Sequence, residues 1–143
     1  MAAALTPMSE PFSFEIRVYW EDTDAGGIVF YANYLKFFER ARTEWLRSLG
    51  IGQHVLREQT GGMFVVSETT VKYHRPAVLD DHLKVTAGVL EAGRASLLIG
   101  QSAWREEPGP RTLLCEGSIR IGWVDAATLK PARIPASILD RLS

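Results

Sequence analysis

The stretch that decides the fold is YANYLKFFERARTEWLRSL, residues 31–49, the longest helical pattern of the chain. Apolar residues recur in it at steps of three and four, so a helix over these residues carries a wide apolar stripe. Charged residues fill the opposite face, and Gly50 follows at a position where helices commonly end in a left-handed residue. A stripe of this width has to be covered by a second layer of structure.

The segments on both sides of this helix supply that layer, because they alternate with the period of strands. Residues 14–20 alternate before the helix. Four further strands are predicted behind it, at residues 64–74, 82–90, 96–105 and 112–124, with short helices at 52–58 and 135–142. This order predicts an α+β fold in which an antiparallel sheet of about five strands wraps round one long central helix.

Length and composition predict a single domain over residues 1–143, with residues 1–12 as a flexible lead-in. The formal charge of -1 gives no general attraction to nucleic acid. No apolar run reaches the length of a membrane span, so no membrane insertion is expected. The N-terminus lacks the features of a secretory signal.

The single cysteine, Cys115, excludes an intrachain disulfide framework and lies on an apolar strand face, which predicts a buried, inert thiol. We therefore expect a cytoplasmic protein.

The chemistry of the chain is expected in the loop EDTDAGG, residues 21–27, between the first strand and the long helix. The paired glycines permit positive φ angles and a close backbone approach. A helix N-terminus offers unpaired N–H groups that favour negative charge. A carboxylate facing those groups, from Asp22 or Asp24, is a plausible hydrolytic arrangement. Aspartates and glycines are also common turn formers and helix caps, so spacing alone leaves both interpretations open.

Several other chemistries find no support in the pattern. A calcium loop counted from Asp22 fails, because Gly26 occupies its fifth position and Asn33 its twelfth. The three histidines, His54, His74 and His82, lack metal-ligand spacing. No nucleophile elbow and no glycine-rich phosphate-binding fingerprint is present. The sequence therefore predicts neither a metal site nor a bound cofactor.

The run VYWEDTDAGGIVFYANYL, residues 18–35, closely resembles the signature of hot-dog thioesterases. The subset it resembles is named for 4-hydroxybenzoyl-CoA thioesterase and the Tol–Pal-associated acyl-CoA thioesterases. The continuation FERARTEWL, residues 38–46, looks like the central helix of the latter group, and VKYHRPA, residues 71–77, is a further match. The likeness covers nearly the whole chain and implies a hot-dog fold.

The resemblance also implies the activity, which is hydrolysis of a short-chain or aromatic acyl-CoA. The catalytic aspartate of the family falls on Asp24, which attacks the thioester or activates water, and Asp22 becomes a structural turn residue. The amide that polarises the carbonyl falls at or near the backbone N–H of Tyr31. Many Tol–Pal-associated members carry His where this chain has Tyr31, and a phenol is a poor base at neutral pH.

Partners and rival functions follow from the same resemblance. Hot-dog domains pair their sheets, so a homodimer or homotetramer is expected, with acyl carrier protein as a second candidate partner. CoA phosphates would suit the basic residues Lys72, His74, Arg75 and Lys84, which are equally typical of solvated strand edges.

A hydratase would need a histidine near the acidic residue, and none lies between Trp20 and Leu49. The remaining alternative is a non-catalytic acyl-carrier-binding or envelope-complex adaptor.

Overall fold

The computed structural model describes residues 12–142 and shows five strands and three α-helices in the order that the sequence predicts. The strands are β1 (Phe12–Arg17), β2 (Gly62–Tyr73), β3 (His82–Ala92), β4 (Ser96–Arg105) and β5 (Thr112–Asp125). The helices are α1 (Asn33–Ser48), α2 (Gln53–Thr60) and α3 (Ala136–Leu142), and a 3-10 turn, η1 (Trp20–Asp22), precedes α1. The flexible lead-in predicted for residues 1–12 falls outside the described residues except at Phe12, which begins β1.

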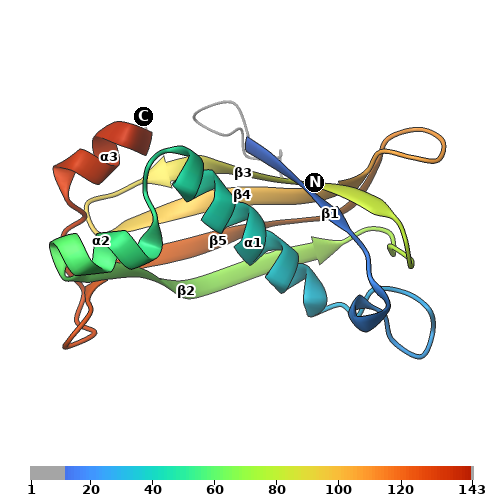
Figure 1. The fold of residues 1–143 in the computed structure, drawn as a ribbon, viewed down its shortest axis with the longest axis horizontal. Helices are drawn as coiled ribbons and strands as arrows, with labels where there is room; N and C mark the ends of the chain where they lie inside the picture. Colours follow the sequence, from blue (N-terminus) through green and yellow to red (C-terminus); the bar gives the residue numbers. More distant parts are fainter. Residues whose placement is uncertain (1–11, 143) are drawn as a thin grey trace.

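The five strands form one antiparallel sheet in the order β1-β3-β4-β5-β2. Helix α1 crosses one face of this sheet and packs against β1, β3 and β4, whereas α2 lies beside β2 (Figure 1). This arrangement confirms the predicted α+β fold, with a sheet curved round one long helix. None of the described helices has the length and apolar character needed to cross a membrane.

The core forms where the apolar stripe of α1 meets the alternating residues of the sheet. Phe37, Phe38 and Leu46 of α1 are almost completely buried. On β4 the buried face is formed by Leu97, Ile99, Gln101 and Ala103, and the opposite face is half-exposed. Burial of apolar side chains of this size contributes roughly 1.5–3 kcal/mol each to stability, so the α1–sheet contact holds the fold together. Cys115 is fully buried, as its strand face predicts, and burial raises the pKa of its thiol to about 12.

The first strand ends earlier than its alternation predicts, at Arg17 and not at residue 20. The cause is the side chain of Asp22, whose Oδ2 accepts the backbone N–H of Tyr19 at 2.9 Å. Val18 bonds to the backbone of residues 80 and 81 and not to β3. The chain therefore leaves the sheet and folds into η1, which brings the acidic loop to the N-terminus of α1. This end of the molecule lies opposite α2 and α3 (Figure 1).

Candidate active site

The loop between η1 and α1 is a tight chain reversal that backbone hydrogen bonds stabilise. Asp24 N–H donates to the Ile28 carbonyl at 2.9 Å, and Phe30 N–H donates to the Asp22 carbonyl at 3.0 Å. An isolated bridge joins Thr23 to Val29. Gly27 has a φ of 79°, a left-handed conformation that favours glycine. Of the two glycines expected to supply positive φ angles, only Gly27 does so.

Asp24 lies at the tip of this reversal and is exposed. Its Oδ1 accepts the N–H of Gly26 at 2.8 Å, and its own carbonyl accepts the N–H of Gly27 at 3.0 Å. The second carboxylate oxygen has no partner within residues 12–142. A Cβ added to Gly26 would lie 3.2 Å from Oδ1, so the small residue leaves room for the carboxylate. Asp24 is thus a turn former that keeps one carboxylate oxygen accessible.

Helix α1 begins at Asn33, two residues later than the helical pattern predicts, and two backbone donors just before it are unpaired. The N–H groups of Tyr31 and Ala32 donate to no acceptor in the described part of the chain, whereas those of Phe30 and Asn33 are both bonded. Unpaired N–H groups at a helix start attract negative charge. Asp24 and Tyr31 are at the two ends of one short loop, but no hydrogen bond joins the Asp24 carboxylate to the Tyr31 amide.

An aromatic cluster, formed by Tyr31 and Tyr73, lies beside the Tyr31 backbone. The Tyr31 ring is exposed by 64% and lies edge-on to the Tyr73 ring, with 6.2 Å between centroids. The Tyr73 hydroxyl donates to the Tyr31 carbonyl at 2.9 Å. Partial burial raises the pKa of Tyr73, so its hydroxyl stays protonated and remains a donor. This contact joins residues 42 positions apart, and nothing in the sequence pattern indicates it.

Of the basic residues considered for phosphate binding, two remain available beside this cluster. Lys72 and Arg75 are exposed on either side of Tyr73 and His74. His74 instead places Nε2 3.3 Å from a carboxylate oxygen of Glu116. Lys84 lies on β3, with Glu15 and Trp104 as its neighbours across the sheet. Lys72 and Arg75 therefore lie next to Tyr73 and His74 in the chain, whereas Lys84 lies on β3, which β4 and β5 separate from β2 in the sheet.

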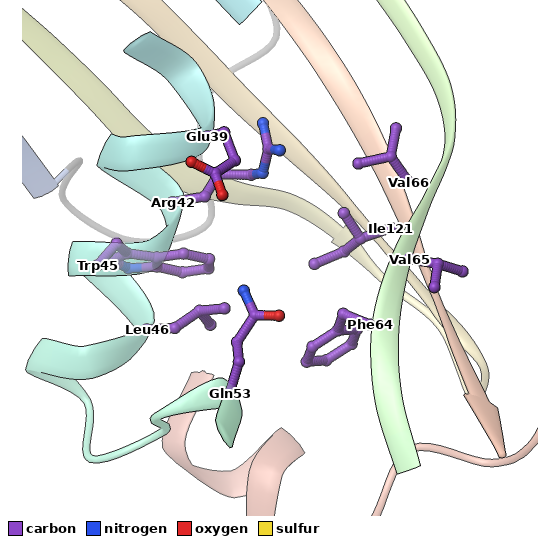
Figure 2. Close-up of a pocket in the computed structure, with 9 residues that line it drawn as sticks. All are labelled: Glu39, Arg42, Trp45, Leu46, Gln53, Phe64, Val65, Val66 and Ile121. Atoms are coloured by element: carbon purple, nitrogen blue, oxygen red, sulfur yellow. The ribbon is translucent and has the colours of Figure 1, made fainter. Parts of the chain in front are cut away.

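A cavity of about 180 Å³ opens between α1, α2 and the β2–β5 side of the sheet. Its lining is largely apolar, with Glu39, Arg42 and Gln53 as the polar members; the complete lining is Glu39, Arg42, Trp45, Leu46, Gln53, Phe64, Val65, Val66 and Ile121. Trp45 and Leu46 face Phe64 and Ile121 across it (Figure 2). No local pattern in the sequence indicates this cavity, because its lining comes from four elements that only the fold brings together.

Arg42 is the least exposed of the three polar residues that line this cavity. One guanidinium nitrogen donates to Oε1 of Gln101 at 2.9 Å, and Gln101 is buried. Burial lowers the pKa of Arg42, and the nearby Glu39 carboxylate partly offsets this effect. No carboxylate oxygen of residues 12–142 forms an ion pair with it within 4 Å. Arg42 thus brings a partly desolvated positive charge to the cavity wall.

Comparison with known proteins decides the family. The model described as "Thioesterase superfamily" matches residues 26–111, which is more than half of the chain. The chain belongs to the thioesterase superfamily. This makes it a thioester hydrolase by enzyme class and confirms the resemblance drawn from the loop and the helix that follows it.

Individual relatives and solved structures agree with this membership. A protein of Haemophilus influenzae named acyl-CoA thioesterase YbgC is 42% identical over 127 residues, which are 89% of this chain and 90% of that protein. A probable thioesterase from Bartonella henselae superposes with a TM-score of 0.80 at 30% identity, over 88% of this chain and all of the other. The 4-hydroxybenzoyl CoA thioesterase of Pseudomonas sp. strain CBS-3 shares the fold, with a TM-score of 0.86 at 20% identity over 93% and 99% of the two chains.

Proposed function

We propose that this protein hydrolyses the thioester of a short-chain or aromatic acyl-CoA, releasing the free acid and CoA. The observation that carries the proposal is the loop that joins the accessible carboxylate of Asp24 to the unpaired N–H groups at the start of α1. The name of the Haemophilus influenzae relative supports acyl-CoA as the substrate class.

The mechanism assigns one role to each end of the loop. The thioester carbonyl oxygen accepts a hydrogen bond from the Tyr31 N–H, which stabilises the negative charge that develops when the carbonyl carbon is attacked. Asp24 either attacks that carbon itself or removes a proton from an attacking water. In both routes the carbon–sulfur bond breaks, CoA leaves as the thiol after protonation, and water supplies the oxygen of the released acid. The Tyr31 side chain takes no proton in this scheme.

The surroundings of the loop suit the CoA end of the substrate. Lys72 and Arg75 are exposed and stand on either side of Tyr73 and His74 in the chain, and Tyr73 bonds to the Tyr31 carbonyl. Exposed positive charge of this kind suits the phosphates of CoA. The cavity beside α1 is lined by Gln53 of α2 and Phe64 of β2, at the end of the molecule opposite the loop, so we do not assign the acyl group to it.

A homodimer or a tetramer of dimers belongs to the same proposal. Strand β2 is an edge of the sheet, and the side chains of residues 66–70 on it are exposed. Val66 is exposed by 51% and Tyr73 by 45%. A long strand edge with exposed apolar side chains tends to pair with another strand. A second copy that pairs along β2 would cover this edge next to Tyr73, and light scattering should give at least twice the 15.9 kDa of one chain. A monodisperse 15.9 kDa species would contradict it.

Hydrolysis of a panel of acyl-CoAs tests the proposal. The panel runs from acetyl-CoA to medium-chain and benzoyl-type CoA, with thiol release followed for the wild type and Asp24→Asn. We expect turnover of at least one compact acyl-CoA, and a fall of roughly 100-fold or more in kcat for the variant. Equal turnover by both proteins would refute the role of Asp24. Absence of turnover by the wild type, combined with tight binding of acyl carrier protein, would favour the adaptor.

A further inference from the structure

Two of the three polar side chains that are deeply buried among residues 12–142 bond to each other, and they flank the active-site loop on its two sides. These two are Asp22 and Asn33, exposed by 6% and 8%; the third is Gln101, on β4. Asn33 Nδ2 donates to Asp22 Oδ1 at 2.7 Å. The other oxygen of Asp22 accepts the N–H of Tyr19 at 2.9 Å. Burying polar groups is costly unless they are bonded, so this pair has a strong preference for one geometry.

The pair joins the two ends of the catalytic loop. Asp22 lies two residues before Asp24, and Asn33, the first residue of α1, lies two residues after Tyr31. The backbone strengthens the same junction, because Phe30 N–H donates to the Asp22 carbonyl at 3.0 Å and Asn33 N–H donates to the Phe30 carbonyl at 2.8 Å. The separation of Asp24 from the Tyr31 amide therefore depends on how Asp22 meets Asn33.

We propose that Asp22 and Asn33 are positioning residues whose buried carboxylate–amide bond sets the geometry between the Asp24 carboxylate and the Tyr31 N–H. The inference rests on the proposed function. Neither side chain needs to touch the substrate, since both act through the loop that they close. A misplacement of about 1 Å in a catalytic site can lower the rate on the order of 100-fold.

The pair is not required to hold α1 on the sheet. Most of the buried face of α1, including Phe37, Phe38 and Leu46, makes that contact more than one helical turn away from the N-terminus, and Tyr34 adds to it from the first turn. An aspartate at the first position of a helix is favourable in itself, because its charge faces the positive end of the helix dipole. Asn33→Asp should therefore disturb the pair while leaving the helix intact.

The experiment compares Asn33→Asp with the exchange Asp22→Asn/Asn33→Asp. The single substitution places two carboxylates face to face, and we expect kcat to fall by roughly 10- to 100-fold, with KM within about threefold. In the exchange, the new amide at position 22 accepts from Tyr19 and donates to the new carboxylate at position 33. The bond from Tyr19 keeps its direction and the bond between positions 22 and 33 is rebuilt in the opposite direction, so kcat should return to within about threefold of the wild type.

A pH profile separates positioning from a general loss of stability. Two facing carboxylates share a proton more readily than one alone, because each disfavours the charge of the other. The kcat of Asn33→Asp relative to the wild type should therefore rise as the pH falls from 8 to 5, at temperatures where both proteins are folded. Asp22→Asn/Asn33→Asp should show the wild-type profile.

Each outcome decides the matter. Wild-type kcat in Asn33→Asp overturns the inference, and so does a folded exchange variant that stays more than about tenfold below the wild type. If Asn33→Asp does not fold, the exchange variant carries the test, and its failure to fold also overturns the inference because both bonds should be present in it. Wild-type protein without turnover refutes the proposed function itself, which the acyl-CoA panel shows separately.

Discussion

The protein contains two exposed aspartates that build the same kind of turn, Asp24 before α1 and Asp125 at the end of β5. Each accepts the N–H of the residue two positions later, at 2.8 Å for Asp24 and 2.9 Å for Asp125. Asp125 also accepts the backbone N–H of Thr128 at 2.9 Å and its hydroxyl at 3.3 Å. The bond from the Thr128 backbone, followed by that from Ala127, lowers the pKa of the Asp125 carboxyl.

What differs is the setting of the two turns. Behind Asp24 the chain enters α1 with the N–H groups of Tyr31 and Ala32 unpaired, beside an exposed aromatic cluster. Behind Asp125 the N–H groups of residues 127 and 128 are bound by the carboxylate itself, and Leu129 N–H returns to the Asp125 carbonyl at 2.7 Å. An aspartate turn becomes a candidate active site when donors next to it remain free for a ligand.

The largest effect is expected from removing the free donor at Tyr31. Tyr31→Pro deletes that N–H and should lower kcat by roughly 100- to 1,000-fold, the usual cost of losing one oxyanion donor. Ala32→Pro deletes the neighbouring free N–H, and its φ of -71° is already that of a proline. The second variant should keep kcat within about threefold, provided that Tyr31 is the donor used.

Tyr31→Phe is the control for the loss of the side chain in Tyr31→Pro. Because the backbone and not the phenol supplies the donor, we expect a change of less than about threefold in kcat. Thermal melts of all three variants establish that they are folded. A large loss in Tyr31→Phe, or an equal loss in both proline variants, would show that the two N–H groups have been assigned wrongly.

A smaller effect is expected from Tyr73→Phe. This change keeps the ring against Tyr31 and removes only the hydrogen bond to the Tyr31 carbonyl. That carbonyl belongs to the peptide group that joins Tyr31 to Ala32, just before α1. Loss of the hydrogen bond should therefore loosen the Tyr31 and Ala32 N–H groups and lower kcat by about two- to fivefold. Steady-state kinetics on the best acyl-CoA measure this fall in kcat. Unchanged kcat and KM would show that the Tyr73 hydroxyl does not contribute to catalysis.

The turn at Asp125 should affect stability and leave activity unchanged. The folded-state pKa of Asp125 is lowered, so its contribution to stability is present above the ordinary aspartate pKa and disappears as the pH falls through the folded value. Asp125→Asn should therefore melt below the wild type at pH 7, and the two melting temperatures should converge below about pH 4. A change in kcat for this variant would contradict the contrast between the two turns.

The sequence predicts the elements of this fold well, because the apolar stripe of residues 31–49 and the alternation of the later strands are strong local signals. It misses the early end of β1, since the bond from Tyr19 N–H to the Asp22 side chain depends on a turn that alternation does not encode. For the site, sequence resemblance points to Asp24 and to the helix start. The contribution of Tyr73 and the cavity beside Trp45 depend on strands distant in sequence, so no local pattern indicates them.

The most direct test of the central claim separates binding from chemistry at Asp24. Wild type, Asp24→Asn and the matched Asp125→Asn are titrated with a non-hydrolysable thioether analogue of the preferred acyl-CoA, and kcat is measured on the thioester itself. We predict that Kd stays within about threefold in all three proteins while kcat falls by roughly 100-fold or more in Asp24→Asn alone. Wild-type kcat in Asp24→Asn, or an equal loss in Asp125→Asn, would contradict the account.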